Sequence, residues 1–244
     1  MNSEAMLVPT IRPWTTADFP GDYALFAAVV GYEQRARFIA SEHAPHAQER
    51  VAIGFKDHQV LHYSENATWY ENAGFTVHHM SDLEYAEYWH LKLRQLSAGR
   101  KPNADLSICV DISSMTRSRM ASLLDAIRKG FGAPGVRADF VYSLAAFSEP
   151  PKSQPPNTHV GPIAPSFAGW WTEPDRVVAA LVGLGYEEDK ALGAVEHLQP
   201  GEVWVFTPQS VVAEYSPALE VANRTLLDSI PASQRLFYRN SSRA

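Results

Sequence analysis

Polar side chains able to bind a ligand follow one short apolar run, Leu106–Val110, in the segment Asp111–Arg117. An aspartate there can organise a loop or accept a ribose hydroxyl, hydroxyl groups suit phosphate or ribose, and an arginine adds a charge-assisted donor fork. The alternative, a helix N-cap preceded by a structural aspartate, stays open. The candidates that we take from this segment for ligand binding are Asp111, Ser113, Ser114, Thr116 and Arg117.

A second polar group follows the first apolar run, Ala24–Val30, and reads Gly31-Tyr32-Glu33-Gln34-Arg35. If both runs are parallel strands, their carboxyl ends share one crevice. Tyr32 is expected to stack on a base, and Arg35 to bind phosphate. Glu33 suits either a catalytic base or stabilisation of a first helical turn. A plain helix start with a half-buried aromatic is the competing interpretation.

Familiar catalytic motifs are missing from the sequence: it has no GxSxG elbow, Walker A run or HExxH pair. Gly130–Gly135 matches GxGxxG, but it follows a predicted helix and precedes a predicted strand, the reverse of a dinucleotide-binding loop. We therefore interpret it as a helix end and loop. The catalytic residues stay unknown, with Glu33 and Asp111 as candidates.

Neither a metal nor a cofactor is predicted. His43 and His46 are three residues apart, yet no carboxylate or cysteine follows at metal-ligand spacing. Cys109 is the one cysteine and lies inside an apolar run, which predicts a buried structural thiol in a reducing compartment.

Short apolar runs alternate with longer amphipathic segments in the first part of the chain, which is typical of parallel strands covered by helices. The fold class predicted is α/β: a Rossmann-like, mostly parallel sheet with helices on both faces, plus a smaller α/β C-terminal extension. The expected strands are Ala24–Val30, Val51–Phe55, Phe75–His79, Leu106–Val110 and Ala138–Ser143, and the expected helices cover 33–44, 66–72, 82–96 and 117–130.

Seven prolines between Glu149 and Pro174 mark a change of composition. We expect a Rossmann-like domain over 1–148, a proline-rich connector over 149–174, and an α/β extension over 175–244 packed on the first domain. Phe167, Trp170 and Trp171 are interpreted either as a lid or as packing between the halves. In the extension the expected strands are 177–184, 202–206 and 235–239, and the expected helices 187–197 and 213–229.

An internal similarity links the two parts, because Gly31-Tyr32-Glu33 and Gly185-Tyr186-Glu187 each follow an apolar run. A duplication and a chance match both stay open.

Composition narrows the class of protein. The 244 residues are 45% hydrophobic and 20% charged, with a net charge of −6, which is ordinary for a globular chain and argues against generic binding of duplex nucleic acid. Arg117, Arg119, Arg128, Lys129 and Arg137 are expected to form a solvated helix face or a local basic site. The N-terminal residues lack the apolar core of a signal peptide, and the longest apolar runs are too short to span a bilayer. A cytoplasmic protein without membrane contact is expected.

The segment Asp111–Arg117 resembles the strand-Asp-(Ile/Leu)-Thr-Gly-Gly-Thr-Lys-helix element of the CARF family, Rossmann-like sensors of cyclic oligonucleotides in prokaryotic antiviral defence. Asp111, Ile112 and Thr116 match that element, Ser113 and Arg117 are similar to it, and Ser114-Met115 stands in place of the glycine pair. The resemblance implies a homodimer with the ligand across its two-fold axis, and Arg35 as a further phosphate contact.

The leading hypothesis is therefore a nucleotide-recognising sensor or effector component of a bacterial defence system, with cyclic oligonucleotides among its ligands, acting as a homodimer or with a partner protein. One alternative is an enzyme that cleaves a nucleotide or nucleoside with a carboxylate at the sheet edge. Another is an assembly scaffold without a ligand.

Overall fold

The computed structural model describes residues 22–99, 106–130, 136–146, 148–149, 160–169, 176–210 and 212–239. The chain divides by its internal contacts into two compact units. The larger comprises Trp14–Ala145 and Pro162–Gly169, and the smaller comprises the remaining residues. We call them the five-stranded unit and the three-stranded unit after their sheets. None of the helices in the described residues is long and apolar enough to cross a bilayer.

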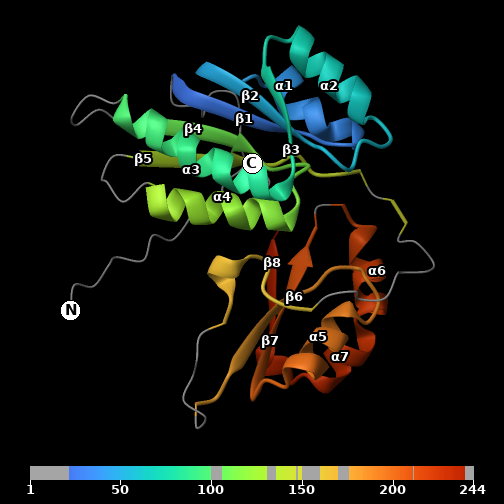
Figure 1. The fold of residues 1–244 in the computed structure, drawn as a ribbon. Helices are drawn as coiled ribbons and strands as arrows, with labels where there is room; N and C mark the ends of the chain where they lie inside the picture. Colours follow the sequence, from blue (N-terminus) through green and yellow to red (C-terminus); the bar gives the residue numbers. More distant parts are fainter. Residues whose placement is uncertain are drawn as a thin grey trace. The chain divides into compact units, whose positions relative to one another are not determined.

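The sheet of the five-stranded unit is entirely parallel, in the order β3-β2-β1-β4-β5 (Figure 1). Its strands are β1 (Tyr23–Val30), β2 (Ala47–Phe55), β3 (Thr76–Met80), β4 (Leu106–Asp111) and β5 (Val136–Val141). The chain moves outward from β1 to β3 and then returns to place β4 beside β1. This reversal leaves a crevice outside the carboxyl ends of the central strands, which is where ligands bind in open α/β sheets.

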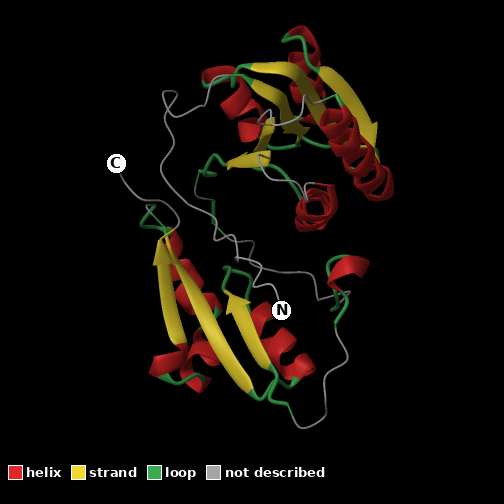
Figure 2. Cartoon of the chain, turned by 90° about the vertical axis from the view of Figure 1, so that its left-hand side faces the viewer, coloured by secondary structure: helices red, strands yellow, loops and turns green. Residues whose placement is uncertain are grey.

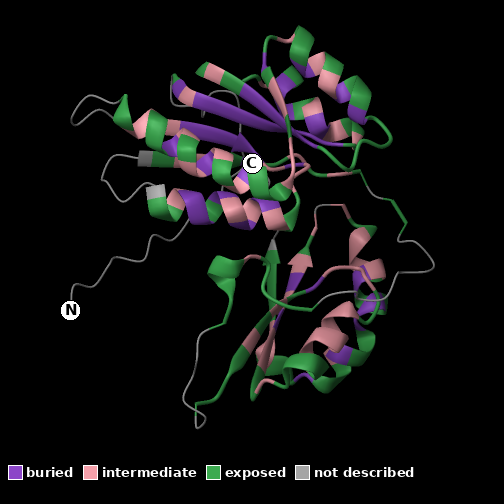
Figure 3. Cartoon of the chain, in the orientation of Figure 1, coloured by how far each residue is buried: buried purple, intermediate pink, exposed green. Residues whose placement is uncertain are grey.

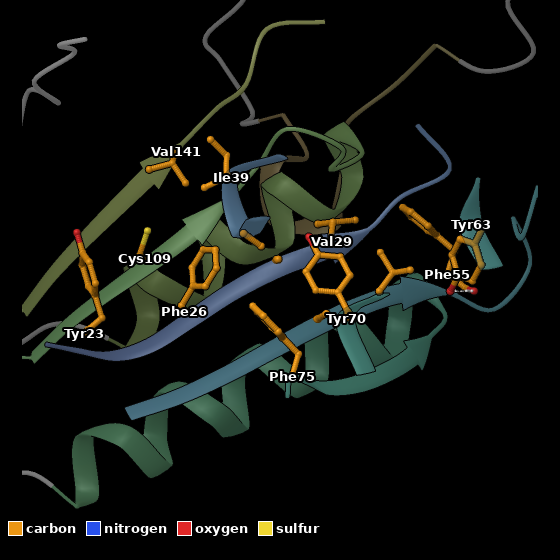
Figure 4. Close-up of a cluster of buried hydrophobic side chains, with 14 residues drawn as sticks. Tyr23, Phe26, Val29, Ile39, Phe55, Tyr63, Tyr70, Phe75, Cys109 and Val141 are labelled. Atoms are coloured by element: carbon orange, nitrogen blue, oxygen red, sulfur yellow. Dashed lines mark hydrogen bonds between the residues drawn. The ribbon is translucent and has the colours of Figure 1, made fainter. Parts of the chain in front are cut away.

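Helices cover both faces of this sheet. They are α1 (Phe38–Glu42), α2 (Tyr63–Asn72), α3 (Asp82–Ala98) and α4 (Arg117–Gly130). The face toward α1 and α2 is filled by aromatic side chains, including Phe26, Tyr70 and Phe75 (Figure 4). The face toward α3 and α4 is filled around Trp89 and Leu123. Since both faces are covered, the central strands are buried almost throughout (Figure 3).

The three-stranded unit has a parallel sheet in the order β6-β7-β8. Its strands are β6 (Ala179–Gly183), β7 (Glu202–Gln209) and β8 (Arg235–Arg239), and its helices are α5 (Lys190–Leu198), α6 (Tyr215–Ala222) and α7 (Arg224–Ser229). The helices lie on one side of this sheet (Figure 2), with a small core that includes Val205, Leu219 and Leu226.

The predicted fold class is confirmed as Rossmann-like α/β with a second, smaller parallel sheet. Several predicted boundaries are wrong. The expected helix 33–44 is a 3-10 turn, Gln34–Arg37, followed by the five-residue α1. Glu33 takes the N-cap position of this 3-10 turn, but its side chain makes no cap hydrogen bond, and its carboxylate accepts a hydrogen bond from Arg35 instead. β2 begins at Ala47, ahead of the expected start.

The C-terminal helix 213–229 is also interrupted, at Asn223. That residue has φ −118°, outside the helical range, and its side chain donates to the carbonyl of Gly185. The expected helix 187–197 begins late, at Lys190, because Asp189 has a left-handed backbone with φ 55°.

Much of the proline-rich connector, with Trp170 and Trp171, lies outside the described residues. Phe167 ends a 3-10 turn, Pro165–Phe167, and is exposed.

The two Gly-Tyr-Glu segments occupy corresponding places. Each follows the first strand of a run of parallel strands, after β1 and after β6. A buried asparagine beyond the second strand donates to the glycine carbonyl in both: Asn66 Nδ2 lies 2.9 Å from Gly31 O, and Asn223 Nδ2 lies 2.6 Å from Gly185 O. The local frame of β1–β2–β3 therefore occurs again in β6–β7–β8.

Candidate functional site

A pocket of about 450 Å³ opens at the carboxyl edge of the five-stranded unit. Its walls come from the loops after β1, β2 and β3 and from the start of α4. We call it the edge pocket. It is lined by Tyr32, Phe55, Lys56, Asp57, His58, Met80, Ser81, Asp82, Thr116 and Arg119.

Arg119 holds these walls together. Its side chain is fully buried, and its guanidinium donates to the carbonyls of Gly54 at 3.0 Å and Met80 at 2.6 Å. Nε also donates to Asp82 Oδ1 at 2.9 Å. The guanidinium carbon lies 3.9 Å from the centre of the Phe55 ring. One cation therefore joins the ends of β2 and β3 to the start of α3, a geometry that the planar fork of arginine permits.

The start of α3 is built from a capping box. Ser81 Oγ accepts the backbone N–H of Glu84, and the Glu84 carboxylate accepts the backbone N–H of Ser81. Lys56, from the loop after β2, forms an ion pair with the same carboxylate. Hydrogen bonding from Lys56, reinforced by Ser81, lowers the pKa of Glu84 to about 2.

Some side chains at the rim have no such partner. Tyr32, Asp57 and His58 line the pocket and are exposed. Within the described part of the chain, none of the three has a side-chain hydrogen bond or ion pair. An aromatic ring, a carboxylate and an imidazole are therefore the groups that a ligand would meet first.

A second group of polar residues lies over the ends of β1, β4 and β5, and we call it the crevice cluster: Glu33, Arg35, Asp111, Ser113 and Ser143. Arg35 Nε donates to Glu33 Oε2 at 2.6 Å, and its Nη1 donates to the carbonyl of Ser143. Ser113 Oγ accepts the backbone N–H of Ser143 at 2.8 Å. These residues largely satisfy one another.

Asp111, at the end of β4, is the exception in the crevice cluster. It is 1% exposed, and Oδ1 accepts the backbone N–H of Ser113 at 2.9 Å, whereas Oδ2 is buried and has no hydrogen-bond partner among the described residues. Burial raises the pKa of this carboxyl to about 6, although the bonds from Ser113 and the charge of Arg35 act to lower it.

The loops after β1 and β4 touch closely at Gly31. A Cβ placed on Gly31 would lie 2.5 Å from the Cβ of Ser114. A glycine is therefore required at this point because another part of the protein occupies the space beside it.

The structure divides the predicted site residues between these two places. Tyr32 and Thr116 line the edge pocket. Glu33, Arg35, Asp111 and Ser113 belong to the crevice cluster, and Ser114 packs between the two loops. Arg117 is the first residue of α4 and is exposed.

Sequence reasoning missed Arg119 and the polar residues after β2 and β3. The interpretation of the basic stretch as a solvated face is wrong for Arg119, which is 1% exposed. Arg128 and Lys129 are exposed, and both pair with Asp125. The rule applied to β1 and β4 also points to the segments 56–58 and 81–82, since they too follow strands at the carboxyl edge.

No cluster of three or more His, Cys, Asp or Glu side chains within the described ranges is placed to hold a metal ion. His46 pairs with Asp22, and His43 packs against the ring of Phe38. The sequence matches no known protein-family model, and no curated protein is significantly similar to it.

Proposed function

We propose that this protein recognises a nucleotide in the edge pocket. The observation that carries the proposal is the position of the pocket at the carboxyl edge of a Rossmann-like parallel sheet, beside the start of a helix, where such folds bind small ligands. Its volume of about 450 Å³ falls within the range of small-molecule sites.

The lining supports a ligand with both an aromatic and a polar part. Tyr32 and Phe55 supply aromatic surface, and Asp57 and His58 supply hydrogen-bonding groups. Base stacking on an aromatic side chain and hydrogen bonding to ribose are the interactions that such a set provides.

Recognition is favoured over catalysis because neither Glu33 nor Asp111 lines the edge pocket. On this proposal the chain acts as a sensor or effector component, and the resemblance to the CARF family implies a defence system, a cyclic oligonucleotide ligand and a homodimer.

Isothermal titration with nucleotides and cyclic oligonucleotides tests this proposal. We expect Tyr32→Ala to weaken binding on the order of tenfold, equivalent to the loss of one stacking contact. Thr116→Ser keeps the hydroxyl that accepts the N–H of Arg119 and should bind like the wild type. Phe38→Ala, an exposed aromatic outside the pocket, is the matched control. Absence of binding by the wild type to every ligand overturns the proposal.

A second candidate function rests on Asp111, whose Oδ2 is buried with no hydrogen-bond partner among the described residues and whose raised pKa, about 6, suits a general acid or base. The reaction would be cleavage of a nucleotide or nucleoside at the crevice. Turnover of NAD, ATP or a cyclic oligonucleotide that disappears in both Asp111→Asn and Glu33→Gln supports it. Turnover that persists in both variants excludes these carboxylates as catalytic residues.

A further inference from the structure

The cationic side chains that line the edge pocket already hold carboxylates. Arg119 is bound to Asp82, and Lys56 is paired with Glu84. A phosphate entering the pocket would have to displace one of these partners or share the cation with it. The wall therefore gives little net attraction to a multiply charged anion.

The positive end of α4 is occupied in the same way. Asp82 Oδ2 accepts the hydroxyl of Ser118 at 2.8 Å, while Oδ1 accepts from Arg119. Thr116 Oγ1 accepts the backbone N–H of Arg119 at 3.3 Å. A protein carboxylate thus stands beside the helix start, where a ligand phosphate binds in many nucleotide-binding folds.

The loop after β1 does not provide an alternative phosphate-binding site. The space beside Gly31 is filled by Ser114, and the next acidic residue, Glu33, precedes a short 3-10 turn instead of a long helix. The close approach of phosphate to a glycine backbone, on which dinucleotide-binding loops depend, is therefore blocked by the protein itself.

Among the described residues that line the pocket, the side chains at its rim that have no hydrogen bond or ion pair are those of Tyr32, Asp57 and His58. A ring stacks on a base, and a carboxylate accepts hydrogen bonds from ribose hydroxyls. A free carboxylate also repels phosphate.

We propose that the edge pocket holds the nucleoside part of its ligand, with the base against Tyr32 and the ribose hydroxyls on Asp57, and that the phosphates stay outside it. This inference rests on the proposed function and specifies which end of the ligand is recognised.

Titration of the four ribonucleosides and their 5′-mono- and 5′-triphosphates tests it. For the best-bound base, we expect the dissociation constants of nucleoside and triphosphate to agree within about threefold, with little change as salt increases, because few phosphate contacts are screened. The 2′,3′-dideoxynucleoside should bind on the order of tenfold more weakly, the effect of losing the carboxylate contact.

Asp57→Asn should reduce this preference for the ribonucleoside. Glu71→Gln, an exposed carboxylate on α2 outside the pocket, should leave it unchanged. A triphosphate that binds more than about tenfold tighter than its nucleoside, with affinity that falls steeply with salt, overturns this inference and leaves nucleotide recognition standing. Failure of every nucleoside and nucleotide to bind overturns the proposed function as well.

Discussion

The five-stranded and three-stranded units share a local frame, but the tyrosine after the first strand has different surroundings in each. In each, a Gly-Tyr-Glu segment follows a strand, and a buried asparagine donates to the glycine carbonyl. Tyr32 lines the edge pocket, whereas Tyr186 stacks on Tyr215, with ring centroids 5.8 Å apart. The same tyrosine position is available to a ligand in one unit and covered by another ring in the other.

This difference shows that the repeated frame alone does not make the site. Thr116 and Arg119, which form one wall of the pocket, lie between β4 and α4 or on α4. Among the residues that the structure describes, the sheet of the three-stranded unit consists of β6, β7 and β8 and has no counterpart of that addition. The segment from β4 into α4 therefore supplies the wall of the pocket that the repeated frame lacks.

The largest effect is expected where that addition meets the frame, at Arg119. Arg119→Met should lower the free energy of unfolding by about 3–5 kcal/mol, because the carbonyls of Gly54 and Met80 lose their buried donor and the ion pair with the half-exposed Asp82 is lost as well. The free energy of unfolding of Arg119→Lys should lie between those of the wild type and Arg119→Met, since an ammonium keeps the charge without the planar fork. Urea denaturation measures both, with the exposed Arg128→Ala as control. A loss below about 1 kcal/mol in Arg119→Met would contradict the assigned role.

A smaller effect, and one that depends on pH, is expected at Asp111. Its pKa in the folded state, about 6, lies above the usual 3.8, so the folded protein binds more protons between about pH 4 and 6. The contribution of Asp111 to stability therefore falls as pH rises through that range, by about 2–3 kcal/mol in total. Asp111→Asn should remove this fall and be more stable than the wild type at pH 8.

Asp125 gives the opposite sign and serves as the internal control for Asp111. Burial acts to raise its pKa, but hydrogen bonds from Lys129 and Arg128 outweigh that and lower it. Its contribution is therefore present at neutral pH and is lost as pH falls. Measured against the wild type, the stability gained by Asp111→Asn should grow as pH rises from about 4 to 6, whereas the stability lost by Asp125→Asn should stay constant above about pH 4 and shrink only below it. The same pH dependence in both variants would refute the assignment.

The shared frame is tested by its two asparagines. Asn66→Ala and Asn223→Ala should each cost about 1–3 kcal/mol, because each leaves a glycine carbonyl without its buried donor. Hydrogen exchange followed by mass spectrometry should place the loss in β1–β3 for Asn66→Ala and in β6–β8 for Asn223→Ala. A loss in only one unit would show that the frame is not equivalent in the two.

The smallest effects on stability are expected at the two tyrosines. Tyr32→Ala should change the free energy of unfolding by less than about 0.5 kcal/mol, because Tyr32 is 38% exposed and pairs with no side chain in the described ranges. Tyr186→Ala should cost about 1 kcal/mol through loss of the stack on Tyr215. Thermal unfolding of the two variants measures the difference, and equal losses would contradict the comparison.

The strands were predictable because a fully buried parallel strand is a short apolar run, and Leu106–Val110 is recognisable as one without a structure. Helix boundaries were less predictable because they depend on contacts far along the chain. Asn223 interrupts a helical pattern to reach Gly185, which is 38 residues away.

At the candidate site, the sequence indicated which residues follow strands but not which of them are already bound to one another. Arg35 was expected to bind phosphate, yet the structure pairs it with Glu33 and with the carbonyl of Ser143. Arg119 belongs to a basic stretch interpreted as a solvated helix face or a local basic site, and the structure buries it in the wall of the pocket.

By itself, the sequence determined the α/β class, the order of strands and helices, and the presence of polar residues at the carboxyl ends of the strands, because these follow from local periodicity and chain order. Only the tertiary structure decided which polar groups remain available to a ligand. Availability depends on hydrogen bonds and ion pairs between segments distant in the chain, such as Arg119 with Gly54, and no local pattern encodes them.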